Sequence, residues 1–344
     1  FSVLKARWKQ LLFGLYPAEE YWRPTVTFGF LVLSIIPILF PKYFRFFWFS
    51  LIYPGLAIWL LWGGSVWNVG MIYIGLVFGA ISFIVMIKTF IKNYTLAGII
   101  SILFVIIFFM FISNILVSIL DIILPISLPP VESLKMGGFT LSLIVGVTGI
   151  VASFPLGILL ALGRQSNLPV IKMICVGFIE FIRGVPLITL LFVASVLLNY
   201  FLPPGTNFDI VLRVVIMVTL FSAAYMAEVI RGGLAGLPLG QHEASASLGL
   251  TYWQSQRLII MPQALKISIP GIVNTFIGLF KDTTLVSIIS LRDPVGLAST
   301  IRADTKWNGI YWELYIAIGL MFFIVCFGMS QYSQYLERKL KTDK

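Results

Sequence analysis

Charged residues divide this chain into long apolar segments and short polar ones. An ionised side chain at the centre of a bilayer costs roughly 2.5 to 3.5 kcal/mol on insertion scales, and about 20 apolar residues cross the hydrocarbon core. A long gap between charges therefore predicts one or two membrane-spanning helices. The gaps and apolar runs predict about nine spans, at residues 23–42, 45–88 (two helices), 92–121, 136–163, 184–199, 210–227, 267–289 and 314–336.

Two polar segments mark breaks in this pattern. The segment GGSVWNVG, residues 63–70, predicts the turn between the two helices of the second gap. The segment DIILPISLPPVESLKMGG, which begins at Asp121, contains three prolines and a glycine pair, which are poor helix formers. The sequence therefore predicts a membrane region of about four spans over 1–120, a linker over 121–137, a second membrane region of about five spans over 138–336, and a tail over 337–344.

Composition supports an all-α integral membrane protein. Of 344 residues, 59% are hydrophobic and only 11% are charged, which is too apolar to give a water-soluble domain a polar surface. The net charge of +10 lies mainly in short loops and in the tail ERKLKTDK, so it favours cytoplasmic anchoring over nucleic-acid binding. Cys175 and Cys326 lie in apolar segments, and their positions support neither a disulfide nor a metal site. Because the sequence begins at Phe1 rather than methionine, a signal segment or a further span upstream stays open.

The polar stretch GQHEASASLGLTYWQSQRLIIMPQAL, residues 240–265, interrupts the apolar second half. Pro238 is expected at a first helical position, Gly249 at a helix stop, and Thr251 with Gln254 in a capping box. These signals predict two short helices of about ten residues each, which meet at Gly249 and are too short to cross a membrane. Small side chains at 244–247 would let another protein approach closely, so the stretch is expected to fit a partner.

The spacing of this stretch resembles a known family motif. Glu243-Ala244-Ser245, three residues, Gly249, nine residues and then IIMP ending at Pro262 is similar to the cytoplasmic EAA loop of ABC importer permeases, E-A-A-x3-G-x9-I-x-L-P. Ser245 replaces the second alanine and Met261 replaces the leucine. The resemblance implies that residues 234–262 form coupling helices that seat in a cleft of the ATP-hydrolysing subunit. The residues it carries over are Gly240, Glu243, Ala244, Ser245, Gly249 and Pro262.

Four further segments extend the resemblance to permeases for polar amino acids and opines, the class for His, Glu, Gln and Arg. The segments are LGILLALGRQS (156–166), FIEFIRGVPLITLLF (178–192), SAAYMAEVIRGG (222–233) and GIVNTFIGLFKDTTLVSII (271–289). The subgroup that the chain most resembles is the general L-amino-acid permeases, in which one subunit carries extra amino-terminal spans. The resemblance implies a type I ABC importer permease core in the cytoplasmic (inner) membrane. It also implies ABC ATPase subunits, a second related permease subunit and an extracytoplasmic amino-acid-binding protein as partners, in addition to membrane lipid.

The resemblance also orients the chain. If the EAA loop faces the cytoplasm, counting spans backwards places the loops at 42–45 and 88–95 inside and the linker outside, in agreement with the positive-inside rule. The tail also falls inside. The count places residues 1–23 outside, although Lys5, Arg7, Lys9 and Arg23 make them basic, as cytoplasmic segments usually are. A miscounted span, or an error in pairing the first four spans, would remove this conflict.

Several charged residues fall inside or at the edges of predicted spans, where an ionisable group is a functional candidate. Glu180, Arg183 and Glu228 are among them. For Arg183 and Glu228 we favour structural roles, since Arg183 precedes a bend at Gly184 and Glu228 can pair with Arg231 near the cytoplasmic surface. The sequence KDTT, comprising Lys281, Asp282, Thr283 and Thr284, lies close to mid-span. In a water-lined path it would bind the carboxylate and the ammonium of an amino acid. An ion pair that holds two helices in register is an equal alternative.

Motifs for catalysis are absent from the sequence. There is no G-x-x-x-x-G-K-[ST], H-E-x-x-H, C-x-x-C or G-x-S-x-G, so we expect no enzyme activity, metal or cofactor, and ATP and Mg are expected to be used by a partner subunit. His242 is expected to be a solvated surface group. The leading hypothesis is the permease subunit of an ATP-driven importer of polar L-amino acids. The alternatives are a secondary transporter driven by an ion gradient and a purely structural membrane subunit.

Overall fold

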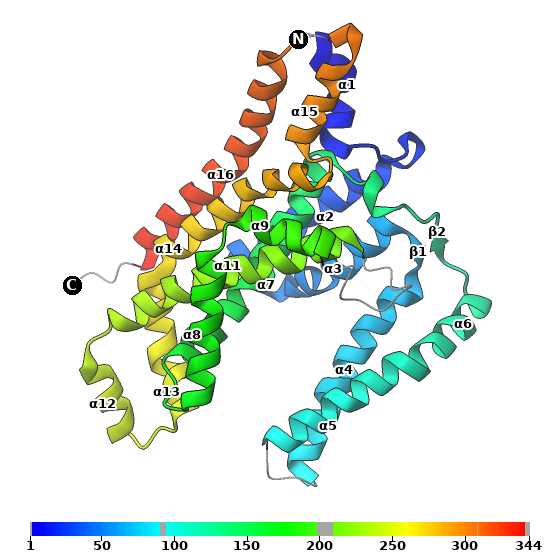
Figure 1. Ribbon diagram of the computed structural model, residues 1–344. Coiled ribbons are helices and arrows are strands. Elements are labelled where there is room, and N and C mark those ends of the chain that lie inside the picture. The colour runs from blue at the N-terminus through cyan, green and yellow to red at the C-terminus, as the bar shows by residue number, and fades with distance from the viewer. Residues whose placement is uncertain (1, 90–93, 198–208, 308, 341–344) are drawn as a thin grey trace. The chain divides into compact units, whose positions relative to one another are not determined.

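The computed structural model describes residues 2–89, 94–197, 209–307 and 309–340 (Figure 1). In these ranges the chain is almost entirely helical, as predicted, and the only strands are β1 (Gly64–Ser65) and β2 (Ser127–Leu128). Among the described residues, eight helical segments are long and apolar enough to cross a membrane, or up to nine if a bent helix pair forms one span. The span count therefore confirms the sequence-based prediction.

The chain divides into two compact units, which are residues 16–135 and residues 1–15 together with 136–344. The prediction differs from this division at the amino terminus, where the first helix packs with the second unit rather than with the spans that follow it. Pattern and composition could not show this, because the packing of a short helix depends on residues far along the chain.

The first unit contains four candidate spans, and its helices pack in sequence order, α2 against α3 and α4 against α5 and α6. The two-residue strands pair antiparallel, with Gly64 opposite Leu128, which joins the turn after the second span to the middle of the linker. Its regular segments are η1 (Ala18–Glu20), α2 (Trp22–Leu39), η2 (Pro41–Phe46), α3 (Phe47–Trp62), α4 (Val66–Thr89), α5 (Tyr94–Ile107), η3 (Phe108–Ile112), α6 (Ser113–Ile123) and η4 (Ser133–Lys135).

Arg23 forms buried contacts that hold parts of this unit together. Its side chain is fully buried, and two guanidinium N–H groups donate to the carbonyl oxygen of Pro129 at 3.0 and 2.9 Å. Glu20 lies 3.8 Å from the same guanidinium. Gly63 has a φ of +76°, and an added Cβ would lie 2.2 Å from the Pro129 oxygen, so only glycine fits here. The start of the first span is thus tied to the linker.

The second unit is a helical bundle built around α7 and α11. Small residues on α7 let the two helices approach closely, for example Gly157 against Met226, and Ser222 donates a hydrogen bond to Ser153 across the contact. Its segments are α1 (Ser2–Phe13), α7 (Gly138–Arg164), α8 (Pro169–Gly184), α9 (Leu187–Phe192), η5 (Val193–Leu197), α11 (Ile210–Ala235), α12 (Leu239–Ser247), α13 (Tyr252–Ser255), η6 (Gln256–Ile260), α14 (Met261–Asp282), η7 (Thr283–Ile289), α15 (Pro294–Ala303), η8 (Thr305–Trp307) and α16 (Trp312–Leu340).

The span predicted at 184–199 is wrong in its boundaries. Helix α8 ends at Gly184, and the chain bends by 101° into α9 and η5, so the span, if it is one, begins near Pro169. The bend follows from Pro186, which disfavours a helical conformation at Val185. The charges on α8, Lys172, Glu180 and Arg183, hid this helix from a search for charge-free gaps. Residues 198–199 lie outside the described part.

Helices α1, α15 and the start of α16 lie side by side in the second unit (Figure 1). Val3 and Leu11 of α1 are buried against a cluster that includes Leu297, Trp307 and Leu314. An ion pair of 2.8 Å joins Arg7 to Asp304. The sequence predicted no partner for this basic amino-terminal segment.

Candidate functional site

The connection between α11 and α14 has the local structure that its sequence signals predict, with two corrections. Gly249 adopts a φ of +72° after α12, and Thr251 and Gln254 form the predicted capping box at the start of α13. Pro238 is the residue before the first helical position rather than that position itself.

The second of the two predicted short helices is wrong as a separate element. Helix α13 continues through the π-helical segment η6 into α14, so that helical structure runs from Tyr252 to Ile289. Pro262 lies inside this run and does not end it, although it has no N–H to bond to the preceding turn; it lies two residues after the wider π-helical turn of η6. The connection therefore consists of one short helix, α12, packed beside the amino-terminal end of a long one.

Most residues of α12 that the sequence singled out are exposed. Gly240, Glu243 and Ala244 face outward, as does Gly249 after the helix. Ser245 differs, since only 3% of it is accessible, and it faces α13. It was expected among the small side chains that a partner contacts. Ala244 and Ala246 are exposed and can contact a partner, whereas the Ser245 hydroxyl is buried and cannot.

Apolar side chains surround this exposed stretch. Leu239, Leu248 and Trp253 are each at least two-thirds exposed. His242 is exposed, as predicted, and no group of metal-ligating side chains occurs among the described residues. Leu239 begins α12, Leu248 directly follows it and Trp253 lies on α13, so exposed apolar side chains flank the polar residues, as is typical of a protein-binding surface.

The four KDTT residues lie where α14 passes into the 3-10 segment η7. Thr283 is buried and donates to the carbonyl oxygen of Phe280 at 2.7 Å, and Thr284 donates to that of Lys281 at 2.9 Å. Lys281 is exposed and Asp282 is half-buried. In the described part of the chain, no ion pair within 4.0 Å joins these two residues to each other or to another helix. The described residues therefore provide no ion pair of the kind that the register alternative requires.

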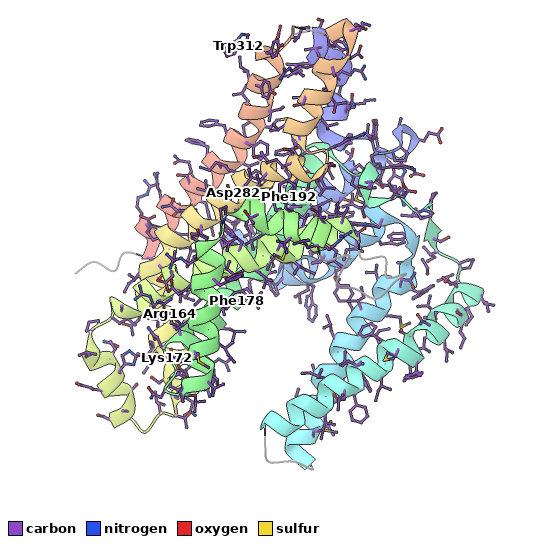
Figure 2. The ribbon with its side chains drawn as sticks, in the orientation of Figure 1. Arg164, Lys172, Phe178, Phe192, Asp282 and Trp312 are labelled. Atoms are coloured by element: carbon purple, nitrogen blue, oxygen red, sulfur yellow. The ribbon has the colours of Figure 1, made fainter. Side chains whose placement is uncertain are left out.

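Sequence reasoning missed a charge network that joins α7, α8 and α11. Glu228 of α11 is 16% exposed and lies 2.8 Å from Arg164, 3.1 Å from Arg231 and 3.6 Å from Arg183. Arg164 also contacts Glu180 of α8 at 2.8 Å. Figure 2 labels Arg164, the last residue of α7, and Phe178 and Lys172 of α8, the helix that packs against it.

The network confirms the predicted Glu228 and Arg231 pair and extends it. Arg183 does more than mark a bend, since it also lies over the ring of Tyr225 at 5.5 Å. A signal was present in the sequence, because all five charges of the network lie in the last half of their helices, Arg164 at the end of α7, Glu180 and Arg183 near the end of α8, and Glu228 and Arg231 near the end of α11. A partly buried network of five charges fixes the relative positions of the three helices.

Comparison with known proteins agrees with the helical architecture. A sequence model of the family "Binding-protein-dependent transport system inner membrane component" matches residues 153–342. The chain is 55% identical to the glutamate/glutamine/aspartate/asparagine transport system permease protein BztC of Rhodobacter capsulatus over 350 aligned residues, which cover all of this chain and 79% of that protein. It is 39% identical to the inner membrane amino-acid ABC transporter permease protein YhdY of Escherichia coli, over 98% of this chain and 77% of that protein.

Among solved structures, the fold is similar to the crystal structure of an amino acid ABC transporter with histidines, with a TM-score of 0.51 and 32% identity. That similarity covers 58% of this chain and 90% of the other. The two long relatives, by contrast, match across the amino-terminal unit as well. The family does not support the alternative of a secondary transporter driven by an ion gradient. The chain belongs to the inner-membrane permease components of binding-protein-dependent ABC importers, and is a multi-pass, non-catalytic translocation subunit.

Proposed function

We propose that this chain imports polar L-amino acids as one of two paired permease subunits. Membership in the family implies an ABC ATPase and a related permease as partners. The observation that carries the substrate class is the 55% identity to a permease named for glutamate, glutamine, aspartate and asparagine, which extends over the whole chain. These four amino acids are the substrates that we propose.

In this proposal, α12 is the contact with the ATPase. Its exposed polar residues, among them Glu243, lie between the exposed apolar residues Leu239 and Leu248, so the helix presents a compact mixed surface to a cleft. This chain holds no cofactor, and the ATPase binds ATP and Mg. An extracytoplasmic binding protein delivers the substrate, in keeping with the family's description as binding-protein-dependent.

A cytoplasmic α12 places α15 and α1 on the extracytoplasmic side. Helix α14 crosses from α12 to the opposite side, where α15 and α1 pack together. The described part of residues 16–135 contains four candidate spans, an even number, so the residues before and after them share one side. Two of the four basic residues in the amino-terminal segment have partners. Arg7 pairs with Asp304, and Arg23 is buried and donates to the carbonyl oxygen of Pro129. The described part of this unit has the four candidate spans that the sequence predicts, so a miscount does not explain the positive charge of the amino-terminal segment.

The substrate path is proposed to follow the exposed face of α14. Asn274 and Lys281 are both exposed and lie seven residues, or nearly two turns, apart, so they share a face. A polar face at span depth is unfavourable against lipid, so a water-filled path or the second permease must cover it. Lys281 would bind the substrate carboxylate and Asp282 its ammonium. Thr283 and Thr284 donate to backbone carbonyls, and they would shape the turn rather than contact the substrate.

The substrate class is tested by uptake into proteoliposomes that contain the complete importer with its ATPase, second permease and binding protein. Labelled glutamate uptake is measured with each of the twenty amino acids as an unlabelled competitor. We expect competition by glutamate, glutamine, aspartate and asparagine. Competition only by apolar amino acids, or by none, would contradict the proposed substrate class.

A further inference from the structure

The hydroxyl group of Ser245 forms a buried contact between α12 and the helix that follows it. Ser255 of α13 donates a hydrogen bond to the Ser245 Oγ at 2.7 Å, and the Ser245 hydroxyl donates to the carbonyl oxygen of His242 at 2.8 Å. Both serines are nearly inaccessible, with 3% and 8% of their surfaces exposed. A hydrogen bond shielded from water is stronger than one at the surface, because water does not compete for its partners.

A second contact lies one helical turn earlier on α12. The side-chain amide of Gln263, on α14, donates to the side-chain oxygen of Gln241 at 3.0 Å and to the carbonyl oxygen of Ile259 at 2.9 Å. Gln241 and Ser245 are four residues apart and therefore lie on the same face of α12. That face is held against the long helix at two points.

The π-helical segment Gln256–Ile260 explains how Ser255 and Gln263 reach one face of the long helix. Eight residues of regular α-helix turn through roughly 800°, about 80° beyond two full turns. Each hydrogen bond of a π-helix spans one more residue than in an α-helix, so a turn contains more residues and each residue rotates the chain by less. The five π-helical residues therefore reduce the excess rotation between Ser255 and Gln263. Without the π segment, the serine and the glutamine would point in different directions.

Helix α12 has no comparable attachment to α11. Among the described residues, every side-chain hydrogen bond that leaves α12 goes to Ser255 or Gln263. The link to α11 is the chain itself, through Gly236, Leu237 and Pro238. This link is packed, since Leu237 is buried in the same core cluster as Leu234 of α11 and its backbone N–H donates to the carbonyl oxygen of Leu234 at 3.3 Å.

We propose that α12 and the cytoplasmic end of α14 move as one rigid lever, which the Ser245–Ser255 and Gln241–Gln263 contacts hold together. This inference rests on the proposed role of α12 as the ATPase contact. A displacement of α12 by the ATPase then reaches α14, the helix that carries Lys281, directly through these side-chain contacts, and it reaches α11 through the packing of α14 on α11, where Ser268 donates to the carbonyl oxygen of Val229. Ser245 and Gln263 are positioning residues for transport, since they touch neither substrate nor nucleotide.

The substitution of serine for the family's second alanine supplies one of these contacts. Alanine at 245 would leave the Ser255 hydroxyl without its acceptor in a buried place, which is unfavourable. The chain therefore pairs the two hydroxyls rather than filling the contact with a methyl group.

A cross-link tests the rigid lever directly. Ser245→Cys and Ser255→Cys are combined with Cys175→Ala and Cys326→Ala in the complete importer, and the new thiols are oxidised to a disulfide, which needs sulfur atoms about 2.0 Å apart. We expect the disulfide to form and ATP-driven uptake to continue at more than half of its reduced rate. Inhibition by oxidation that reduction reverses would show that the two residues separate during transport, and would overturn the proposal. Failure to cross-link would contradict the contact itself.

Removal of both contacts tests their use in coupling. In Ser245→Ala/Gln263→Leu, we expect the number of substrate molecules imported per ATP hydrolysed to fall at least threefold, while the importer assembles and hydrolyses ATP. Ser299→Ala is the matched control, because Ser299 lies on α15, outside the proposed ATPase contact and substrate path, is exposed, and donates only to the carbonyl oxygen of Val295. An unchanged ratio in the double variant would overturn the proposal.

The two failures are distinguishable. If the unmodified importer shows no ATP-driven uptake, or if α12 contacts no ATPase, the proposed function itself is wrong. If the unmodified importer works and only the cross-link or the ratio gives the contrary result, the proposed function stands and the rigid lever does not.

Discussion

Gly14 lies beside Met136 in an isolated antiparallel bridge, although a complete four-span unit separates them in sequence. The approach requires glycine, since Gly14 has a φ of +72° and an added Cβ would lie 2.4 Å from the Cα of Gly137. Gly138 has a φ of +60° and lies close to the carbonyl oxygen of Leu11. Helix α1 is therefore fixed at the start of α7, and residues 16–135 leave and rejoin the permease core at one place.

This bridge predicts that α1 is extracytoplasmic despite its positive charge. In a background with Cys175→Ala and Cys326→Ala, Lys9→Cys should react with a membrane-impermeant maleimide added outside intact cells, because Lys9 is exposed on α1. Lys339→Cys, exposed near the end of α16, should react only after the membrane is opened. Protection of Lys9→Cys from the external reagent would contradict the orientation.

Glu228 is predicted to stabilise the core more than any other carboxylate of its network. Glu228→Gln leaves Arg164, Arg183 and Arg231 without their shared negative partner, and should lower the free energy of unfolding by about 2–3 kcal/mol, since removal of one partner from a buried pair is strongly destabilising. Glu180→Gln is the control, because Glu180 is 56% exposed and should contribute less than about 1 kcal/mol. Thermal unfolding in nanodiscs measures both. Equal effects would refute the central place of Glu228.

The carboxyl group of Asp293 is predicted to make stability depend on pH. Burial raises its pKa from the ordinary value to about 6, although hydrogen bonds from the backbone N–H groups of Gly296 and Val295 oppose the shift. Between about pH 4 and pH 6 the folded protein holds a proton that the unfolded chain has released, so stability is greatest below this window and falls as pH rises through it, by at most about 3 kcal/mol. Asp293→Asn keeps an acceptor for the cap of α15 and should flatten the profile of melting temperature against pH. A variant with the wild-type slope would assign the effect to another group.

Lys281 is predicted to serve transport rather than assembly. Lys281→Ala should reduce uptake at least tenfold while the complex assembles and basal ATP hydrolysis continues, because in the described part of the chain Lys281 makes no ion pair that holds helices together. Lys172→Ala, an equally exposed lysine on α8, is the control. Loss of the assembled complex in Lys281→Ala would instead support a structural role.

The sequence predicted the features that local chemistry determines. Charge-free gaps found the long spans, because burying a charge in lipid is costly at any position. The Gly249 turn and the Thr251 capping box depend on residues within a few positions of each other, and both are present in the structure. The spacing from Glu243 to Pro262 could likewise be compared with the family pattern, because the motif is one continuous segment of the chain.

The missed features depend on residues that meet only after folding. Ser245 is buried because Ser255, ten residues away, returns to it across a turn. Helix α8 was missed because it carries charges. In the folded chain Glu180 pairs with α7 and Arg183 pairs with α11, and the pattern of residues along the sequence does not show these pairs. The packing of α1 on α15 joins residues nearly three hundred positions apart, and nothing near Arg7 in the sequence indicates Asp304.

The central claim is that this permease is moved by ATP hydrolysis in a partner that contacts α12. Its most direct test is uptake of labelled glutamate by proteoliposomes that contain the complete importer and enclosed ATP, with the proton gradient collapsed by an ionophore. We predict that uptake continues without the gradient and stops when the enclosed ATP is replaced by a non-hydrolysable analogue. Uptake that stops with the ionophore and continues with the analogue would contradict the account.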